Sequence, residues 1–132
     1  VQAHDGWVRT LEFDGSAGIA ASAGDDGSVK AWLLQKRRLV PIATAEDAHP
    51  DGVRGLLIEA SSKLLISAGD NAVLKIWRIA CGGLRPTATV QDAHGGVIFD
   101  LQFHAEASAA RRLLSSGMDG IIKVWDLSGG KL

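Results

Sequence analysis

The sequence predicts an all-β chain built from three repeats, each a four-stranded antiparallel sheet, with the sheets stacked face to face. One observation behind this prediction is a hairpin written three times, in which two short, largely apolar runs enclose a turn containing Gly and Asp. Its copies span residues 20–33, 65–78 and 113–126. Another is the spacing of His4, His49 and His94, which lie 45 residues apart. A hairpin restated at a nearly fixed interval indicates a repeat architecture.

The overall composition argues against several classes of protein. The 132 residues carry 14 Lys and Arg against 15 Asp and Glu, a formal net charge of −1, which gives no overall electrostatic case for binding nucleic acid or a membrane. The single cysteine, Cys81, rules out an internal disulfide and fits a reducing compartment, so we expect an intracellular location, cytoplasmic or nuclear. No apolar run approaches the roughly 20 residues that span a bilayer, and no signal-peptide pattern is present.

The first strand of each repeat is expected just after the histidine. A branched aliphatic residue, Val8, Val53 or Ile98, follows each histidine by four positions and opens an alternating run of about six residues. A turn then leads to a second strand, expected at 18–23, 63–68 and 112–116.

The third strand of each repeat is expected to follow the Gly/Asp turn and to end in Trp32, Trp77 or Trp125. Fourth strands are expected at 39–44 and 84–90, and in the third repeat only residues 128–132 remain for one. Inner stretches such as 64–66 are apolar on both faces, which favours sheets covered on both sides. The third repeat is longer between its first two strands, and we expect 104–111 to form an extended hairpin loop with His104 solvated.

The repeats resemble the WD40 β-propeller family. The matching features are the closing tryptophan and the histidine, which here follows an alanine in each repeat where the family prefers Gly-His. Only Trp125-Asp126 carries the literal Trp-Asp pair. The resemblance covers essentially the whole chain and implies a partial ring of three consecutive blades. Blade 1 is expected at about 4–45, blade 2 at about 49–91 and blade 3 at about 94–132, the last with an incomplete outer strand.

The resemblance also implies a hydrogen-bonded tetrad of His, Ser or Thr, Asp and Trp in each blade. The corresponding residues are His4, Ser22, Asp26 and Trp32 in blade 1, His49, Ser67, Asn71 and Trp77 in blade 2, and His94, Ser115, Asp119 and Trp125 in blade 3. Asn71 stands where the other repeats have Asp. Because an amide carries no charge, its bond to the histidine is expected to be weaker, and blade 2 to be the least firmly held.

Recurring Ser, His and Asp also invite a hydrolase interpretation, but a nucleophile needs one exposed, activated serine. Here the set recurs with a tryptophan each time, which favours buried polar groups that satisfy one another. A metal site from the three histidines and Cys81 lacks local ligand spacing, and the turns 24–27 and 81–83 lack the context of a phosphate loop. We therefore expect no enzyme activity, no metal, no cofactor and no small-molecule substrate.

Charge is expected to divide between the two ends of the blades. By the resemblance, the loops that enter the first strand and join the second to the third form the top face, and the other loops form the bottom face. Acidic residues fall in the top loops: Asp5, Asp25, Glu46, Asp47, Asp51, Asp70 and Asp92. Basic residues fall in or beside the bottom loops, with Asp14 and Glu106 as exceptions: Lys36, Arg37, Arg38, Arg111, Arg112 and Lys131. The alternative is ordinary solvated turns, where Asp is favoured for backbone reasons.

Members of the family commonly bind peptides at three top-face positions per blade. Carried over, these protein-binding positions are Trp7, Arg9 and Asp25 in blade 1, Gly52, Arg54 and Asp70 in blade 2, and Val97, Phe99 and Met118 in blade 3. Exposed aromatic, Arg and Met side chains are usual interface anchors, and Trp7 and Phe99 are the leading candidates. The alternative for both is partial burial against a neighbouring blade.

The sequence thus indicates an interaction scaffold that binds a protein or peptide, basic or mixed in charge, on the top face. An alternative is a purely structural wall of a large multiprotein assembly, in which another chain would cover Trp7 and Phe99. A third, weaker alternative is RNA binding through residues 36–38 on the bottom face. Three blades do not close a ring of about 4 to 8, so we expect the remaining blades to come from the same protein or from other chains.

Overall fold

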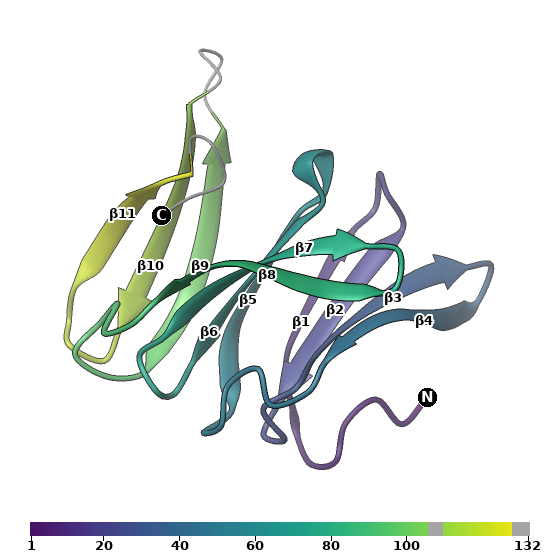
Figure 1. Cartoon of the computed structure of the whole chain (residues 1–132), viewed down its shortest axis with the longest axis horizontal. Coiled ribbons are helices and arrows are strands. Elements are labelled where there is room, and N and C mark those ends of the chain that lie inside the picture. The colour runs from purple at the N-terminus through teal and green to yellow at the C-terminus, as the bar shows by residue number, and fades with distance from the viewer. Residues whose placement is uncertain (106–109, 128–132) are drawn as a thin grey trace.

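The computed structural model describes residues 1–105 and 110–127, and it confirms the all-β prediction (Figure 1). Each sheet is antiparallel, and its strands pair in chain order. Blade 1 comprises β1 (Val8–Asp14), β2 (Ile19–Gly24), β3 (Val29–Gln35) and β4 (Arg38–Ala45). Blade 2 comprises β5 (Val53–Glu59), the short 3-10 helix η1 (Ala60–Ser62), β6 (Leu64–Gly69), β7 (Leu74–Ala80) and β8 (Gly83–Val90). Blade 3 comprises β9 (Ile98–Ala105), β10 (Arg111–Gly117) and β11 (Ile122–Asp126).

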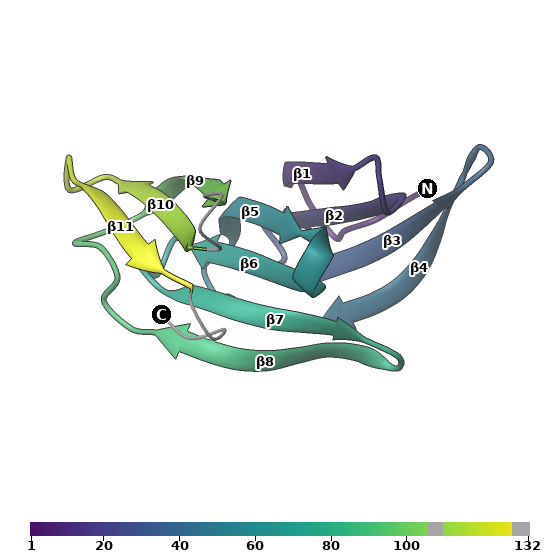
Figure 2. The same ribbon diagram turned by 90° about the horizontal axis from the view of Figure 1, so that it is seen from above.

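The blades stand side by side in chain order. Figure 2 shows the first strands β1, β5 and β9 along one side of the array, and the fourth strands β4 and β8 along the other. The turns β2–β3, β6–β7 and β10–β11 lie at one end of the blades, which is the top face, and the opposite turns form the bottom face (Figure 1). In blade 1, successive strands pair as antiparallel hairpins joined by short turns, with a register shift in the β1–β2 pair and in the β3–β4 pair.

The long loop expected at 104–111 is shorter than the sequence suggests. β9 continues through Ala105 and β10 begins at Arg111, because these two residues pair across the hairpin, as do His104 and Arg112. His104 is therefore a strand residue, although its side chain is exposed, as expected. The rest of that loop, with Glu106, and the residues expected to begin a fourth strand, with Lys131, lie outside the described residues.

Apolar side chains fill the two spaces between the blades. One cluster joins blades 1 and 2 and includes Ala23, Val29, Leu56 and Leu65. A second cluster joins blades 2 and 3. All six residues of β6 are buried, because adjacent positions of this strand face different neighbours. The run 64–66, apolar on both faces, is explained by this double coverage.

Blades 1 and 3 each expose one sheet face whose counterpart in blade 2 is buried. Leu74 and Ile76 of β7 are fully buried by blade 3, but the residues at the same distance before the closing tryptophan of blade 3, Ile122 and Val124, are 71% and 59% exposed. On the other side, Leu56 of β5 is 3% exposed, whereas its counterpart Leu11 in β1 is 63% exposed. Both ends of the described array therefore carry an open apolar sheet face.

Candidate functional site

A buried polar group links the loop before β1 to the inner strands of blade 1. His4 Nε2 lies 2.8 Å from Ser22 Oγ, and the indole N–H of Trp32 donates to the same oxygen at 2.9 Å. On the other side of the ring, His4 Nδ1 lies 3.0 Å from the Asp26 carboxylate and 3.0 Å from Ser28 Oγ. The structure thus brings the four expected residues together and adds Ser28, which the comparison of repeats did not indicate.

The same arrangement recurs in the other blades. In blade 3, His94 lies 2.7 Å from Ser115 Oγ and 3.0 Å from the Asp119 carboxylate, and Trp125 donates to the serine at 2.8 Å. In blade 2, His49 lies 2.8 Å from Ser67 Oγ, but its other nitrogen is 3.3 Å from the amide oxygen of Asn71. Trp77 donates to Ser67 at 2.8 Å. The amide contact is the longest of these histidine bonds.

Each histidine lies between an acceptor and a serine, the order found in serine hydrolases. However, Ser22, Ser67 and Ser115 are all buried, and a tryptophan N–H occupies each serine oxygen. Each set therefore fastens a top loop to two strands of its own blade.

The charges of these sets differ between blades. Burial raises the pKa of Asp26, but hydrogen bonds from Ser28, His4 and Asp5 outweigh it and bring the pKa to about 2. Bonds from the Gly95 N–H and from His94 likewise lower the pKa of Asp119 to about 2. In blade 2, burial lowers the pKa of His49 to about 4 despite its bond to Asn71, so this ring is neutral at pH 7.

The three protein-binding positions expected in blade 1 contact one another on the top face. The backbone N–H of Asp25 donates to the carbonyl oxygen of Trp7 at 3.0 Å. Arg9 Nε lies 2.5 Å from the Asp25 carboxylate, and its guanidinium carbon lies 5.1 Å from the centroid of the Trp7 ring. A ring, a cation and a carboxylate are therefore joined in one chain of contacts.

Blades 2 and 3 repeat this backbone hydrogen bond, but the side chains around it differ. Asp70 N donates to Gly52 O at 3.1 Å, and Arg54 Nε lies 2.6 Å from Asp70. In blade 3, Met118 N donates to Val97 O at 2.8 Å. The positions of the Arg and the Asp are taken there by Phe99 and Met118. The surface thus changes from ion pairs on blades 1 and 2 to apolar groups on blade 3.

The aromatic and sulfur-containing side chains of these positions are accessible. Trp7 is 71% exposed, Phe99 51% and Met118 70%. Val97 is half-buried and Gly52 is buried, so these two contribute backbone more than side chain. Within the described chain, neither Trp7 nor Phe99 is buried against a neighbouring blade.

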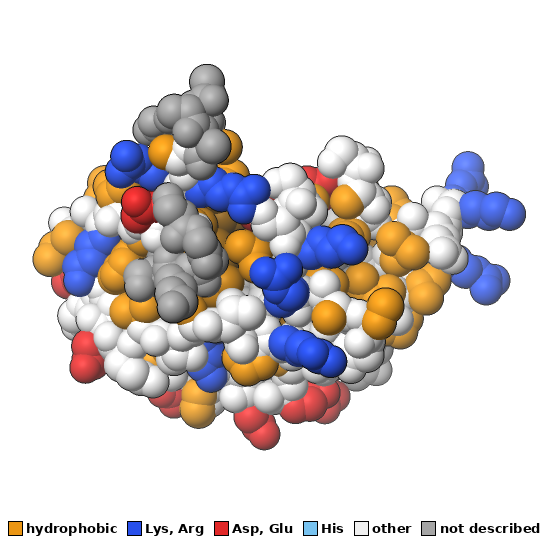
Figure 3. Space-filling model, turned by 45° about the horizontal axis from the view of Figure 1, so that its top comes forward, with side chains coloured by type: hydrophobic (Ala, Val, Ile, Leu, Met, Phe, Trp, Pro, Cys, Tyr) orange, Lys and Arg blue, Asp and Glu red, His pale blue; other side chains and the backbone are white. Residues whose placement is uncertain are grey.

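Two acids of the top face are already paired with arginines, so they are less available to bind a cation from a ligand. Asp25 and Asp70 are engaged by Arg9 and Arg54, and the comparison of repeats missed this pairing, although the same 16-residue Arg-to-Asp spacing occurs twice. The other acids of the top loops are exposed and have no ion pair among the described residues: Asp5, Glu46, Asp47, Asp51 and Asp92. In Figure 3, acidic side chains gather along the lower rim, and Lys and Arg side chains spread over the surface above it.

The bottom face is basic in one region and internally paired in another. Lys36 and Arg37 of the β3–β4 turn and Arg38 at the start of β4 are exposed. Arg111, by contrast, reaches from blade 3 to blade 2, where it lies 3.5 Å from the Glu59 carboxylate and donates to Ser62. It therefore joins two blades and is not a free surface cation.

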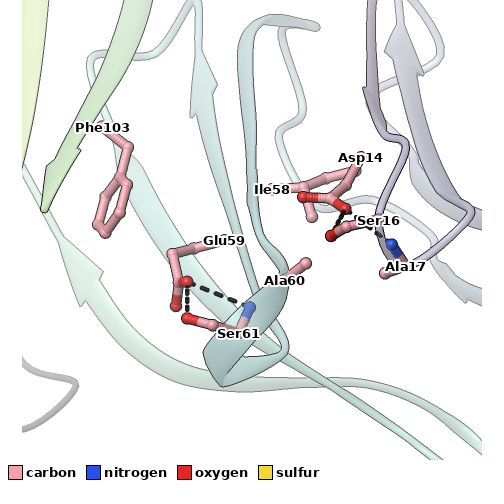
Figure 4. Close-up of a pocket in the computed structure, with 8 residues that line it drawn as sticks. All are labelled: Asp14, Ser16, Ala17, Ile58, Glu59, Ala60, Ser61 and Phe103. Atoms are coloured by element: carbon pink, nitrogen blue, oxygen red, sulfur yellow. Dashed lines mark hydrogen bonds between the residues drawn. The ribbon is translucent and has the colours of Figure 1, made fainter.

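A cavity of about 360 Å³ opens where the bottom ends of the three blades meet (Figure 4). Its two carboxylates serve the local backbone. Asp14 accepts bonds from Ser16 and from the Ala17 N–H, which lower its pKa. Burial raises the pKa of Glu59, but bonds from Ser61 and Ser62 and the charge of Arg111 together outweigh burial. The pKa of Glu59 is therefore lowered. Asp14 therefore serves its own turn, whereas Glu59 serves its turn and also pairs with Arg111 of blade 3.

In the described ranges, no cluster of three or more His, Cys, Asp or Glu side chains is arranged to hold a metal ion. No helix in this part of the chain is long and apolar enough to cross a membrane.

A known family model matches the chain over three consecutive segments. The family model described as "WD domain, G-beta repeat" matches residues 1–32, 40–78 and 85–126. The second and third matched segments begin within β4 and β8 and end within β7 and β11, so each takes the fourth strand of one blade and three strands of the next. No curated protein matches the chain.

Proposed function

The chain belongs to the WD40 repeat family, whose repeats generally act as protein-interaction scaffolds, and we propose that its top face binds a protein or peptide. The observation that carries this proposal is the exposure of Trp7, Phe99 and Met118 around two Arg-Asp ion pairs. Large exposed aromatic and Met side chains beside arginines have the composition of interface hot spots.

The ligand is a peptide of basic or mixed charge that also carries apolar side chains. Its cations are attracted by the exposed acids of the top loops, such as Asp47, Asp51 and Asp92, which have no ion pair within the described ranges. Its apolar side chains pack on Phe99 and Met118, since blade 3 has no charge at these positions. Charge then governs the association rate and orientation, while the aromatic and Met contacts supply most of the affinity.

A random-sequence peptide library displayed on phage tests this proposal. Selected peptides are titrated against the chain and against Phe99→Ala. Phe13→Ala is the matched control, because Phe13 is 52% exposed and Phe99 is 51% exposed, but Phe13 lies on the open face of blade 1. We expect Phe99→Ala to weaken binding at least about tenfold, as for an interface anchor, and Phe13→Ala to leave it unchanged. Selected peptides that depend on Phe13 instead would contradict the proposal.

A structural role in a larger assembly is the second candidate, favoured by the open apolar faces of blades 1 and 3. Leu11 in β1 and Ile122 in β11 are mostly exposed, although their counterparts in blade 2 are buried. This candidate predicts that Ile122→Lys abolishes association with an assembly while top-face variants leave it intact. The reverse result would favour peptide binding.

A further inference from the structure

A second groove lies on the bottom face, between blades 1 and 2, on the opposite ends of the strands from Trp7 and Asp25. Its volume is about 610 Å³, within the range of about 300 to 1,000 Å³ typical of ligand pockets. Half-buried isoleucines line it from both blades: Ile19 and Ile42 from β2 and β4, and Ile79 from β7. Both of its walls belong to complete four-stranded sheets.

At the corresponding place between blades 2 and 3, the equivalent residues make different contacts. Ile79 N donates to Lys63 O at 2.8 Å, and Leu127 N donates to Arg111 O at 2.9 Å, so these two pairs occupy equivalent positions. Arg111 crosses to Glu59 and Ser62 of the neighbouring blade, and Leu127 is buried. Between blades 2 and 3, the two equivalent positions are thus held by a bonded cation and a buried apolar residue.

Between blades 1 and 2, the two equivalent positions hold Lys63 and Ile79, which are less engaged. Lys63 is exposed and forms no ion pair with any described residue, and Ile79 is only partly buried. The residue of blade 1 that corresponds to Glu59 is Asp14, whose carboxylate is held by Ser16 and Ala17. The groove therefore retains an accessible apolar floor and an unpaired cation at its edge.

The lining chemistry identifies the kind of ligand. No acidic residue lines the groove among the described residues, and its lining includes the exposed cation Lys63. The described walls are aliphatic and carry no aromatic ring on which a nucleobase could stack, which disfavours single-stranded RNA. We propose that this groove binds a peptide segment in which aliphatic side chains are followed by carboxylates. The aliphatic side chains cover Ile19, Ile42 and Ile79, and a carboxylate pairs with Lys63.

Cys81 offers a direct probe, because it is the only cysteine in the sequence, is exposed and lines the groove. The rate at which iodoacetamide alkylates Cys81 is measured against rising concentrations of a capped peptide with two leucines followed by a run of glutamates. We expect the peptide to slow alkylation in a saturable way. The same peptide with serines in place of the leucines should give no protection, because charge alone does not fill the groove.

Two lysines provide a matched pair of variants. Lys63 and Lys36 are both exposed, both lie on the bottom face, and both have a backbone φ of 56°. Lys63→Glu and Lys36→Glu therefore change the net charge equally and strain the backbone alike. We expect Lys63→Glu to weaken the protection about tenfold and Lys36→Glu less than about twofold. Equal losses from the two variants, protection by the serine peptide, or protection of Cys81 by polyuridylate but not by the leucine peptide would each overturn the proposal.

Discussion

Arg54 of blade 2 lies over the ring of Phe99 in blade 3, with its guanidinium carbon 5.8 Å from the ring centroid, while its Nε lies 2.6 Å from Asp70. One arginine thus joins the ion pair of its own blade to the apolar group of the next. Because a stacked, paired guanidinium loses much of its freedom before a ligand arrives, Arg54 and Phe99 form a preorganised part of the top face.

Charge changes in the Arg9–Asp25 pair should separate stability from binding. Asp25→Lys removes an exposed ion pair and places two cations together, so we expect a small loss of stability and weaker binding of a basic peptide. The double swap Arg9→Asp with Asp25→Arg keeps an ion pair while exchanging its ends. Chemical denaturation should show recovered stability for the swap, and peptide titration should still show weakened binding. Binding that recovers together with stability would mean that the pair acts only through the fold.

Because Asn71 of blade 2 carries no charge, we can predict how the stability of the chain depends on pH. Burial lowers the pKa of His49 from 6.5 to about 4. Below pH 6.5 the unfolded chain binds a proton that the folded chain resists, so stability falls as the pH drops from about 6.5 towards 4. In Asn71→Asp, a carboxylate stabilises the protonated ring, so the folded pKa rises and this loss becomes smaller. At pH 7 the variant should be more stable by about 1 kcal/mol, because a charged acceptor strengthens the bond.

Denaturant midpoints at pH 7 and pH 5 check the Asn71→Asp prediction. The reciprocal change, Asp119→Asn in blade 3, is the control and should lower stability at pH 7. An unchanged difference between the two pH values in Asn71→Asp would show that the acid sensitivity arises elsewhere in the chain.

The fold and the buried tetrads could be predicted because both follow the repeat. Once His4, His49 and His94 are aligned, residues at matched distances fall in matched places, and the all-β architecture and family follow. Contacts that differ between repeats could not be predicted in this way. Arg111 and Lys63 share one position in the repeat, yet only Arg111 reaches a carboxylate, since the partner that each meets depends on the blade before it.

Two turn glycines allow the effect of a neighbouring blade on stability to be measured. Gly27 and Gly120 occupy the same place in the repeat and both have a left-handed φ, 72° and 76°. A Cβ on Gly27 would lie 2.2 Å from the backbone oxygen of His49, whereas a Cβ on Gly120 would meet nothing within 4 Å. We expect Gly120→Ala to cost about 1 to 2 kcal/mol for the strained φ alone. Gly27→Ala should cost roughly 3 to 5 kcal/mol, because the overpacking adds to that strain.

Thermal or denaturant unfolding of the two alanine variants measures the difference. Ala72, the residue at this place in blade 2, has a φ of 61° and provides an independent control. Ala72→Gly should raise stability by about 1 kcal/mol, because it relieves the same strain. Equal costs for Gly27→Ala and Gly120→Ala would show that the loop before β5 moves away from Gly27 without penalty.

Backbone amide chemical shifts can show whether the top face is the main binding surface of the chain. Uniformly ¹⁵N-labelled chain is titrated with a peptide selected from the phage library. We predict that the largest shift changes fall on Arg9, Asp25, Asp70, Phe99 and Met118, with little change at Lys36 or Cys81 on the bottom face. Changes centred instead on Leu11, Phe13, Ile122 and Val124 would place the ligand on the open faces of the outer blades and contradict the claim.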